Sequence, residues 1–185
     1  LLMAENGRFY TLSGDKLPRG RGFGEPLSLM LDIPADASII AIMRGGIGKM
    51  LVASNAGHGM IVDMQSAIAQ TRSGKQVLNL GAGGKAVICV PAQGDMVAVV
   101  GQNRRLLVFA LSELPEMTRG KGVILQRYRD GELADIKVFE SEAGLTWQMG
   151  GGRTRTETDL LTWTGKRGSA GKLPPTGFPR PARFT

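Results

Sequence analysis

The sequence contains very few of the side chains that most enzymes and metal sites depend on. Its 185 residues include one cysteine, Cys89, and one histidine, His58. A single cysteine excludes a disulfide within the chain and is typical of a reducing compartment. His58 lies in a glycine-rich stretch with no histidine, cysteine or carboxylate at metal-ligand spacing. We therefore expect no metal site and interpret His58 as an exposed turn residue.

Long hydrophobic runs are also missing. No stretch approaches the ~18 consecutive apolar residues that a membrane-spanning helix needs. The first residues do not show the charged and apolar regions of a signal peptide. These absences predict no membrane span and a cytoplasmic location.

Glycine and positive charge are abundant. The chain has 27 glycines and 9 prolines without a collagen period, which favours the many tight turns of an all-β protein. Lys and Arg number 23 against 16 Asp and Glu, giving a net charge of +7. Such a surface attracts polyanions such as nucleic acid.

A unit of roughly fifty residues recurs four times, at a period typical of blade repeats. Each copy has an apolar strand, a turn with Gly or Asn, a second apolar strand, a polar link and a glycine-rich basic loop. One arginine per loop marks the register, with separations of 53, 47 and 48 residues: Arg19, Arg72, Arg119 and Arg167. Three or four short strands in a unit of this length indicate propeller-like blades.

The repeat predicts one all-β domain over residues 1–173. It would hold a partial blade at 1–30 and blades at about 31–80, 81–127 and 128–173. Because the first copy lacks leading strands, we expect the array to be truncated at its N-terminal side. Residues 174–185 are basic and rich in proline, and are expected to form an irregular tail.

Three motifs resemble a known family. They are Leu-Val-Ala-Ser-Asn-Ala-Gly-His-Gly at 51–59, Leu-Pro-Arg-Gly-Arg-Gly at 17–22, and the stretch 112–122 with its Leu-Pro and Arg-Gly-Lys-Gly. All are similar to the C-terminal domain of the bacterial DNA topoisomerase IV A subunit, which is related to the gyrase A C-terminal domain. The resemblance covers nearly the whole chain except the last repeat and the tail. It implies a β-pinwheel, a propeller-like disc whose adjacent blades exchange strands and whose outer rim binds double-stranded DNA.

The family also implies the setting of such a domain. It is appended to a core that cleaves DNA through a tyrosine, within a type IIA enzyme that relaxes and decatenates DNA on the chromosome. ATP, Mg and the ATPase B subunit, with the A-subunit dimer, are expected only in that parent enzyme. Nothing here resembles the core, since Tyr10 and Tyr128 lie in a repeat strand and beside a basic loop. We therefore expect no catalytic residue and no cofactor in this chain, and a role in selecting substrates by crossing geometry or supercoil handedness.

The basic loops are the candidate DNA-binding site. Glycines let a backbone come close to a duplex while Arg and Lys contact phosphates. Repeated around a disc, such contacts would bend DNA with little reading of base identity. The candidates are Arg19, Arg21, Arg72, Lys75, Arg119, Lys121, Lys166, Arg167 and Lys172. Secondary candidates at hairpin turns and strand ends are Arg104, Arg105, Arg127, Arg129, Arg153 and Arg155.

Two other functions remain open. The gyrase A domain wraps DNA with a box reading Gln-Arg-Arg-Gly-Gly-Lys-Gly, and its counterpart at residues 70–76 keeps four of the seven letters. That departure favours topoisomerase IV over gyrase. A propeller-type module that binds an acidic protein is the alternative from a different class. An enzyme on a propeller is disfavoured, because no carboxylate or histidine constellation recurs and residues 81–85 lack the spacing of a phosphate loop.

Overall fold

The computed structural model describes residues 1–185 and consists of short antiparallel strands, as the glycine-rich repeats predict. Apart from strands it has four single-turn 3-10 helices, and no helix is long and apolar enough to cross a membrane. The all-β prediction is confirmed. The strands are β1 Leu2–Ala4, β2 Arg8–Tyr10, β3 Ile39–Ile42, β4 Lys49–Ser54, β5 His58–Asp63, β6 Lys75–Gln76, β7 Ala86–Pro91, β8 Met96–Gly101, β9 Leu106–Ala110, β10 Val123–Ile124, β11 Leu133–Phe139, β12 Leu145–Gln148 and β13 Thr154–Glu157. The helices are η1 Gly14–Lys16, η2 Leu27–Leu29, η3 Leu111–Glu113 and η4 Gly150–Gly152.

Four hairpins form the centres of four sheets, and the strand that follows a hairpin crosses to the preceding sheet. β6 follows the β4–β5 hairpin but pairs with β2, and β10 follows β8–β9 but pairs with β5. The next strand then returns to its own hairpin, so that β7 pairs with β4 and β11 with β8. This exchange of strands confirms the predicted β-pinwheel.

The last unit follows the same rule with less regular backbone. After β13, Thr164 and Lys172 form bridges to Val108 and Leu106 of β9. The chain then returns to its own hairpin, where the Gln148 N–H donates to the Phe184 carbonyl at 3.0 Å. Three of the four sheets use residues of two repeats, so that blades drawn as contiguous ranges do not coincide with these sheets.

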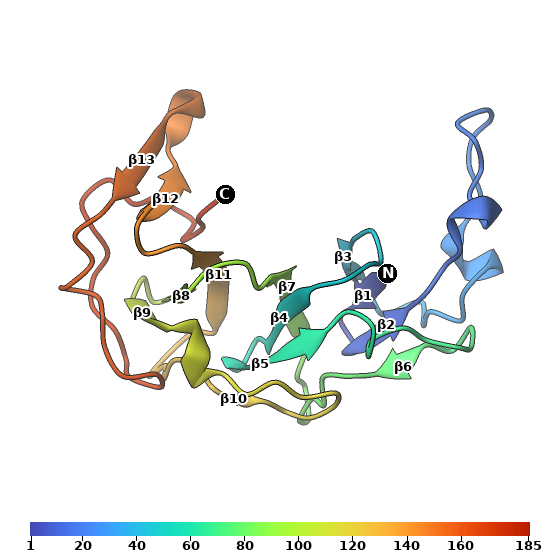
Figure 1. The fold of residues 1–185 in the computed structure, drawn as a ribbon, viewed down its shortest axis with the longest axis horizontal. Helices are drawn as coiled ribbons and strands as arrows, with labels where there is room; N and C mark the ends of the chain where they lie inside the picture. Colours follow the sequence, from blue (N-terminus) through green and yellow to red (C-terminus); the bar gives the residue numbers. More distant parts are fainter.

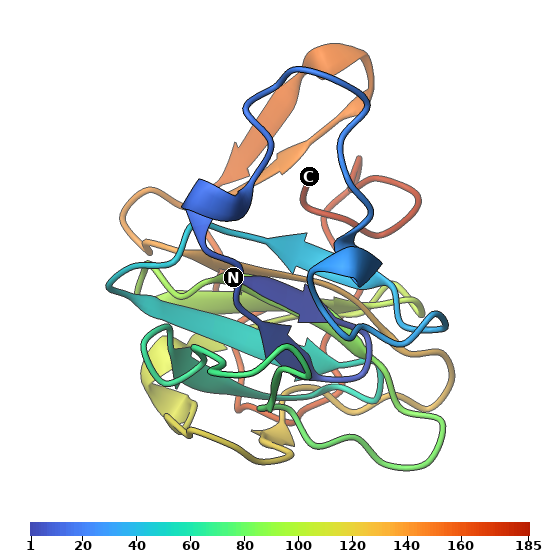
Figure 2. The ribbon, with the colours of Figure 1, turned by 90° about the vertical axis from the view of Figure 1, so that its right-hand side faces the viewer.

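The stretches that follow the four hairpins are joined to one another as an outer rim. We call them crossover segments: the first is residues 11–38, the second 64–85, the third 111–132 and the fourth 158–181. Neighbouring segments are joined by backbone hydrogen bonds, from Asp32 to Arg72 (2.9 Å), Asn79 to Gly120 (2.8 Å) and Gly168 to Leu125 (2.8 Å). Figure 1 shows the four units along an open arc, with β6 and β10 on its lower, convex edge and both termini on the opposite side. Figure 2 shows the β12–β13 hairpin and the loop of the first crossover segment rising above the stacked sheets.

The strands of the β4–β5 and β8–β9 hairpins are buried on both faces, which explains their continuous apolar runs. Met50 and Val52 of β4 contribute to the core shared with β1 and β2, while Leu51 contributes to the core shared with β8 and β9. Val97 of β8 lies in that second core, and its neighbour Ala98 lies in a third core shared with β12. The blades are therefore held together by the cores between them.

The C-terminal residues differ from expectation. Residues 174–185 carry no helix or strand, but Phe178 and Phe184 are buried in the third core. The Phe178 ring lies 5.4 Å from Trp147 and 5.5 Å from Phe184 between centroids. Asp135 accepts the Phe184 N–H at 2.8 Å. The sequence placed this stretch outside the domain as a tail, whereas its aromatic rings cover Trp147 and make it part of the folded unit.

Candidate nucleic-acid interface

The basic loops are shaped by glycines that lie against the neighbouring sheet. Gly74, Gly122 and Gly171 have positive φ of 73°, 78° and 78°. A Cβ atom at these positions would lie only 2.7 Å from the Phe9 carbonyl oxygen, 2.2 Å from that of Gly59 and 2.6 Å from that of Leu106. The sequence suggested that such glycines permit close approach of DNA. In the structure, these three glycines let the crossover segments pack against the outer strands.

The first loop projects into solvent. Arg19 and Arg21 are exposed, and neither side chain has a hydrogen bond or ion pair within the protein. The two arginines are therefore free to contact a ligand, but nothing in the fold orients them.

The second loop is partly engaged by the protein itself. Arg72 donates to the Leu29 carbonyl at 3.0 Å and lies 3.4 Å from the Asp32 carboxylate. Lys75 donates to the Ser66 carbonyl at 2.6 Å. Both cations are therefore engaged within the protein, and a phosphate would have to displace these contacts, each of which contributes only a small energy because it is exposed.

The third and fourth loops meet in one pocket of about 750 Å³. Lys121 comes from the third crossover segment, and Lys166 and Arg167 come from the fourth. The guanidinium of Arg167 donates to the Ile124 carbonyl at 2.6 Å, which fixes one segment on the other. Arg119 lies outside the pocket and donates to the Asn79 side chain at 3.3 Å. Lys172 lies outside it too, and its backbone pairs with Leu106.

His58 is not the exposed turn residue that the sequence suggested. It begins β5, is half-buried and lines the pocket beside Lys121. Burial and the nearby Lys121 lower the pKa of His58, and its Nδ1 is buried without a hydrogen-bond partner. Arg127, only a secondary candidate before, lines the same pocket. No local signal identifies this grouping, because the exchanged strand β10 creates it.

Two of the secondary candidates hold the C-terminal stretch instead. Arg104 donates to the Pro179 carbonyl at 2.8 Å and to that of Phe178 at 3.2 Å. Arg155 lies over the Trp147 ring, 5.6 Å from its centroid, and donates to the Thr176 carbonyl at 2.6 Å. Both arginines therefore act in packing.

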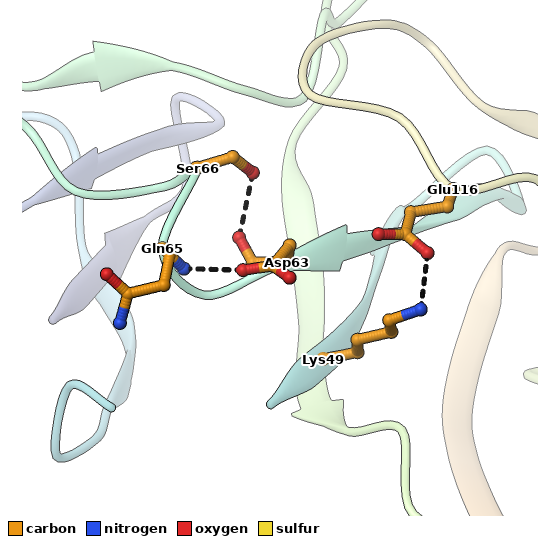
Figure 3. A network of polar contacts seen from close by, with 5 residues as sticks. All are labelled: Lys49, Asp63, Gln65, Ser66 and Glu116. Carbon is orange, nitrogen blue, oxygen red and sulfur yellow. Dashed lines mark hydrogen bonds and ion pairs between the residues drawn. The ribbon is translucent and has the colours of Figure 1, made fainter. Parts of the chain in front are cut away.

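Ionic and polar contacts also fasten the third crossover segment to the β4–β5 hairpin. Figure 3 shows Lys49 of β4 beside Glu116, with 2.5 Å between their charged atoms. Glu116 raises the pKa of Lys49 by this contact. In the same view Asp63 closes the turn after β5, where its side chain accepts the Gln65 N–H and its carbonyl accepts the Ser66 hydroxyl, both at 2.8 Å. The Lys49–Glu116 pair thus joins the third crossover segment to β4, and the Asp63 contacts shape the turn that leads into the second crossover segment.

The remaining titratable groups do not form a second site. No group of three or more His, Cys, Asp or Glu side chains is placed to hold a metal ion. Cys89 packs beside the first core, and burial raises the pKa of its thiol to about 12. A thiol with that pKa stays protonated at neutral pH and is a packing residue.

Comparisons with known proteins agree with this architecture. The family model of the DNA gyrase C-terminal domain, described as a β-propeller, matches residues 95–134. The A subunit of DNA topoisomerase 4 from Rickettsia bellii is 42% identical over 100% of this chain, which spans 25% of that protein. The A subunit of DNA topoisomerase 4 from Caulobacter vibrioides is 44% identical over 100% of this chain, which spans 24% of that protein. The chain thus spans about a quarter of the length of these relatives.

Solved structures give the same picture. The E. coli ParC C-terminal domain superposes with a TM-score of 0.82 at 28% identity, covering 95% of this chain and 76% of that one. A DNA gyrase A C-terminal domain matches with a TM-score of 0.65 over 92% and 58% of the two chains, and at 14% identity it supports the fold alone.

The exchanged strands and these matches define the chain as a β-pinwheel domain of the kind found in the A subunits of gyrase and topoisomerase IV. Within that class it resembles, along its whole length, the C-terminal domain of the topoisomerase IV A subunit, the ParC type. The resemblance inferred from the sequence motifs is confirmed.

Proposed function

We propose that this chain binds and bends double-stranded DNA along its outer rim, as the C-terminal domain of a topoisomerase IV A subunit. One observation carries the proposal: the predicted basic loops belong to crossover segments that are joined in series by backbone hydrogen bonds, and the second, third and fourth segments run along the lower, convex edge, while the first loop rises away from it (Figures 1 and 2). A duplex in contact with successive loops has to follow that curvature. Phosphate contacts of this type position DNA without reading its sequence.

In the parent enzyme such a domain would hold one DNA segment and favour particular crossings or supercoil handedness. Strand cleavage, ATP and Mg would belong to the rest of the A-subunit dimer and to the B subunit. The chain itself would be a non-catalytic part of a chromosome-associated, cytoplasmic enzyme. Its net charge of +7 supports this assignment of partner.

The test is binding to random-sequence duplex DNA at several salt concentrations. If the loops together neutralise roughly 4–8 phosphates, log K falls with log salt at a slope of about −4 to −7. Unrelated duplexes of equal length should bind within a few-fold of each other. A slope near zero, or one strongly preferred sequence, would contradict the proposal. If an acidic polypeptide bound to the domain and duplex DNA did not, the protein-interaction alternative would be favoured.

Bending without full wrapping is the second part of the proposal. The counterpart of the gyrase box has Arg72 engaged by Asp32, and its Gly74 packed against Phe9. These contacts leave the box less available for a tight wrap. Closed circular plasmid relaxed and religated with excess protein should therefore show little change in linking number. A large shift that grows with protein concentration would instead support gyrase-like wrapping.

A further inference from the structure

The pocket where the third and fourth crossover segments meet differs from the other basic loops. Four cationic side chains line it, and no carboxylate does. They are Lys121, Arg127, Lys166 and Arg167. The nearest contact with an acid is at the backbone, where the Arg167 N–H donates to Glu113 at 3.4 Å. Mutual repulsion of these charges is therefore not relieved by a protein anion inside the pocket.

The pocket is built by backbone pairing and not by flexible side chains alone. The Gly168 N–H donates to the Leu125 carbonyl at 2.8 Å, and the Arg127 N–H donates to the Ser169 carbonyl at 3.2 Å. On its other side, β10 pairs Ile124 with His58. Two crossover segments and one strand thus fix the backbone around the cations, which lowers the entropy lost when a ligand orders them.

Two nitrogen atoms at the pocket have no hydrogen-bond partner in the protein. They are Nδ1 of His58 and Nε of Arg167, and both atoms are buried. Unpartnered buried polar atoms are costly and uncommon in folded proteins. The hydrogen-bonding capacity of these two nitrogen atoms is therefore not satisfied by the protein itself.

We propose that this pocket is the anchoring phosphate site of the rim, where Lys121, Lys166 and Arg167 hold a backbone phosphodiester of duplex DNA and His58 lies against the bound group. The inference rests on the proposed function and refines it, because it assigns more of the DNA affinity to this pocket than to the other basic loops. The second loop already engages its cations with Leu29, Asp32 and Ser66. The first loop is unsupported by any other element, so the third and fourth loops together are the best-organised part of the rim.

His58 supplies a specific reporter, because it is the only histidine in the chain. The charged groups that line the pocket with its imidazole are Lys121, Arg127, Lys166 and Arg167, all cationic. A bound phosphate would offset their effect and favour the imidazolium. NMR of the imidazole signals, followed through a pH titration with and without a short duplex, measures this directly. The His58 midpoint should move to higher pH by about one unit when DNA is bound.

A pair of charge-matched variants tests the anchoring role. Lys121→Ala with Lys166→Ala removes two cations from the pocket, and Arg72→Ala with Lys75→Ala removes two from the second loop. If the pocket anchors the duplex, the first pair should weaken binding about ten- to a hundred-fold, and the second pair clearly less. Thermal melting checks that both variants are folded, and neither pocket lysine has a side-chain hydrogen bond within the protein that its loss would break.

The outcomes separate the two proposals. Salt-dependent DNA binding with an unmoved His58 midpoint, or with equal losses in both variant pairs, would overturn the anchoring site and leave the proposed function standing. Absence of duplex binding at low salt would overturn both. Inorganic phosphate or polyglutamate at matched ionic strength provides the remaining controls. A His58 shift with either of these but not with duplex would show a site for free anions or acidic protein, and would also overturn the proposal.

Discussion

At the scale of single residues, the glycines of the crossover segments determine how closely adjacent blades can be joined. Gly122 is the tightest of them, because its missing side chain leaves only the space that the Gly59 carbonyl needs. The same residue has a positive φ, which side chains other than glycine adopt at a cost. We therefore expect Gly122 to stabilise the folded domain and to affect DNA binding only indirectly.

The residue that tests this is Gly122. Gly122→Ala should lower the free energy of unfolding by about 2–4 kcal/mol, because backbone strain and steric overlap add. Gly20→Ala is the matched control, since Gly20 also has a positive φ of 73° but no atom within 4 Å of a Cβ. It should cost about 1 kcal/mol from strain alone. Urea denaturation measures both, and equal losses would show that the contact with Gly59 is unimportant.

His58 should also leave a signature in stability. Its pKa in the folded chain lies below the ordinary 6.5, because burial and Lys121 disfavour the charged ring. The unfolded chain therefore takes up the proton at a higher pH than the folded chain does. The contribution of the neutral His58 ring to the free energy of unfolding is complete above pH 6.5 and is lost as the pH falls toward the folded pKa. In the absence of DNA, the wild-type melting temperature should fall more steeply with acidification than that of His58→Gln. Parallel curves would mean that His58 does not couple folding to protons.

At the scale of elements, the C-terminal stretch takes the place of a regular β-strand beside β12. Its backbone pairs with β12, and its aromatic rings cover the same core that Trp147 enters. Arg104 and Arg155 hold it from two sides through carbonyl contacts. An irregular segment can therefore be as integral to a blade as a regular one.

Phe184→Ala tests this element. The side chain is 1% exposed, and removing a buried phenylalanine costs about 3–5 kcal/mol. Tryptophan emission, from Trp147 and from Trp163 at the edge of the same core, should shift to the red at lower denaturant concentrations than in the wild type. Arg183→Ala, on an exposed neighbouring position, should stay within about 0.5 kcal/mol of wild type. Similar stability of the two variants would mean that the stretch is a loosely attached tail after all.

The elements also show what a sequence can and cannot reveal about this fold. Hairpins such as β4–β5 were readable, because apolar runs and a glycine turn lie close together in the chain. Strands such as β6 and β10 were not, because two residues carry no periodic pattern and their partners lie in another repeat. The C-terminal stretch was misplaced for a related reason, since proline and arginine outweigh two phenylalanines in composition.

At the scale of the whole molecule, the exchange of strands should make unfolding cooperative. The first two sheets lose a strand, and the third loses its bridges to Thr164 and Lys172, when the next unit opens, so partial unfolding exposes more than one core. Far-UV circular dichroism, which reports all four sheets, and the fluorescence of Trp147 and Trp163, which both pack at the third core, should give the same denaturation midpoint. An earlier transition in fluorescence would mean that the last unit unfolds by itself.

The candidate interface was predictable at this scale but not in its detail. Net charge and the repeated loops indicated a polyanion partner and named the crossover cations. Their inequality was hidden, because Asp32 of the first crossover segment reaches Arg72, whereas Lys121, Lys166 and Arg167 are brought together in one pocket by two other segments. Contacts between repeats determine which cations can reach a ligand, and a motif that recurs in each repeat carries no information about those contacts.

The hydrogen bonds between neighbouring crossover segments have a mechanical consequence. A duplex drawn tight around the convex edge would press on segments that are already linked to one another, so the load spreads across several blades and not onto one loop. Tension on the C-terminal end would act differently, first peeling Phe184 from β12 and then opening the hairpin behind it. The domain is therefore built to resist force applied across its rim better than force applied along its chain at the C-terminal end.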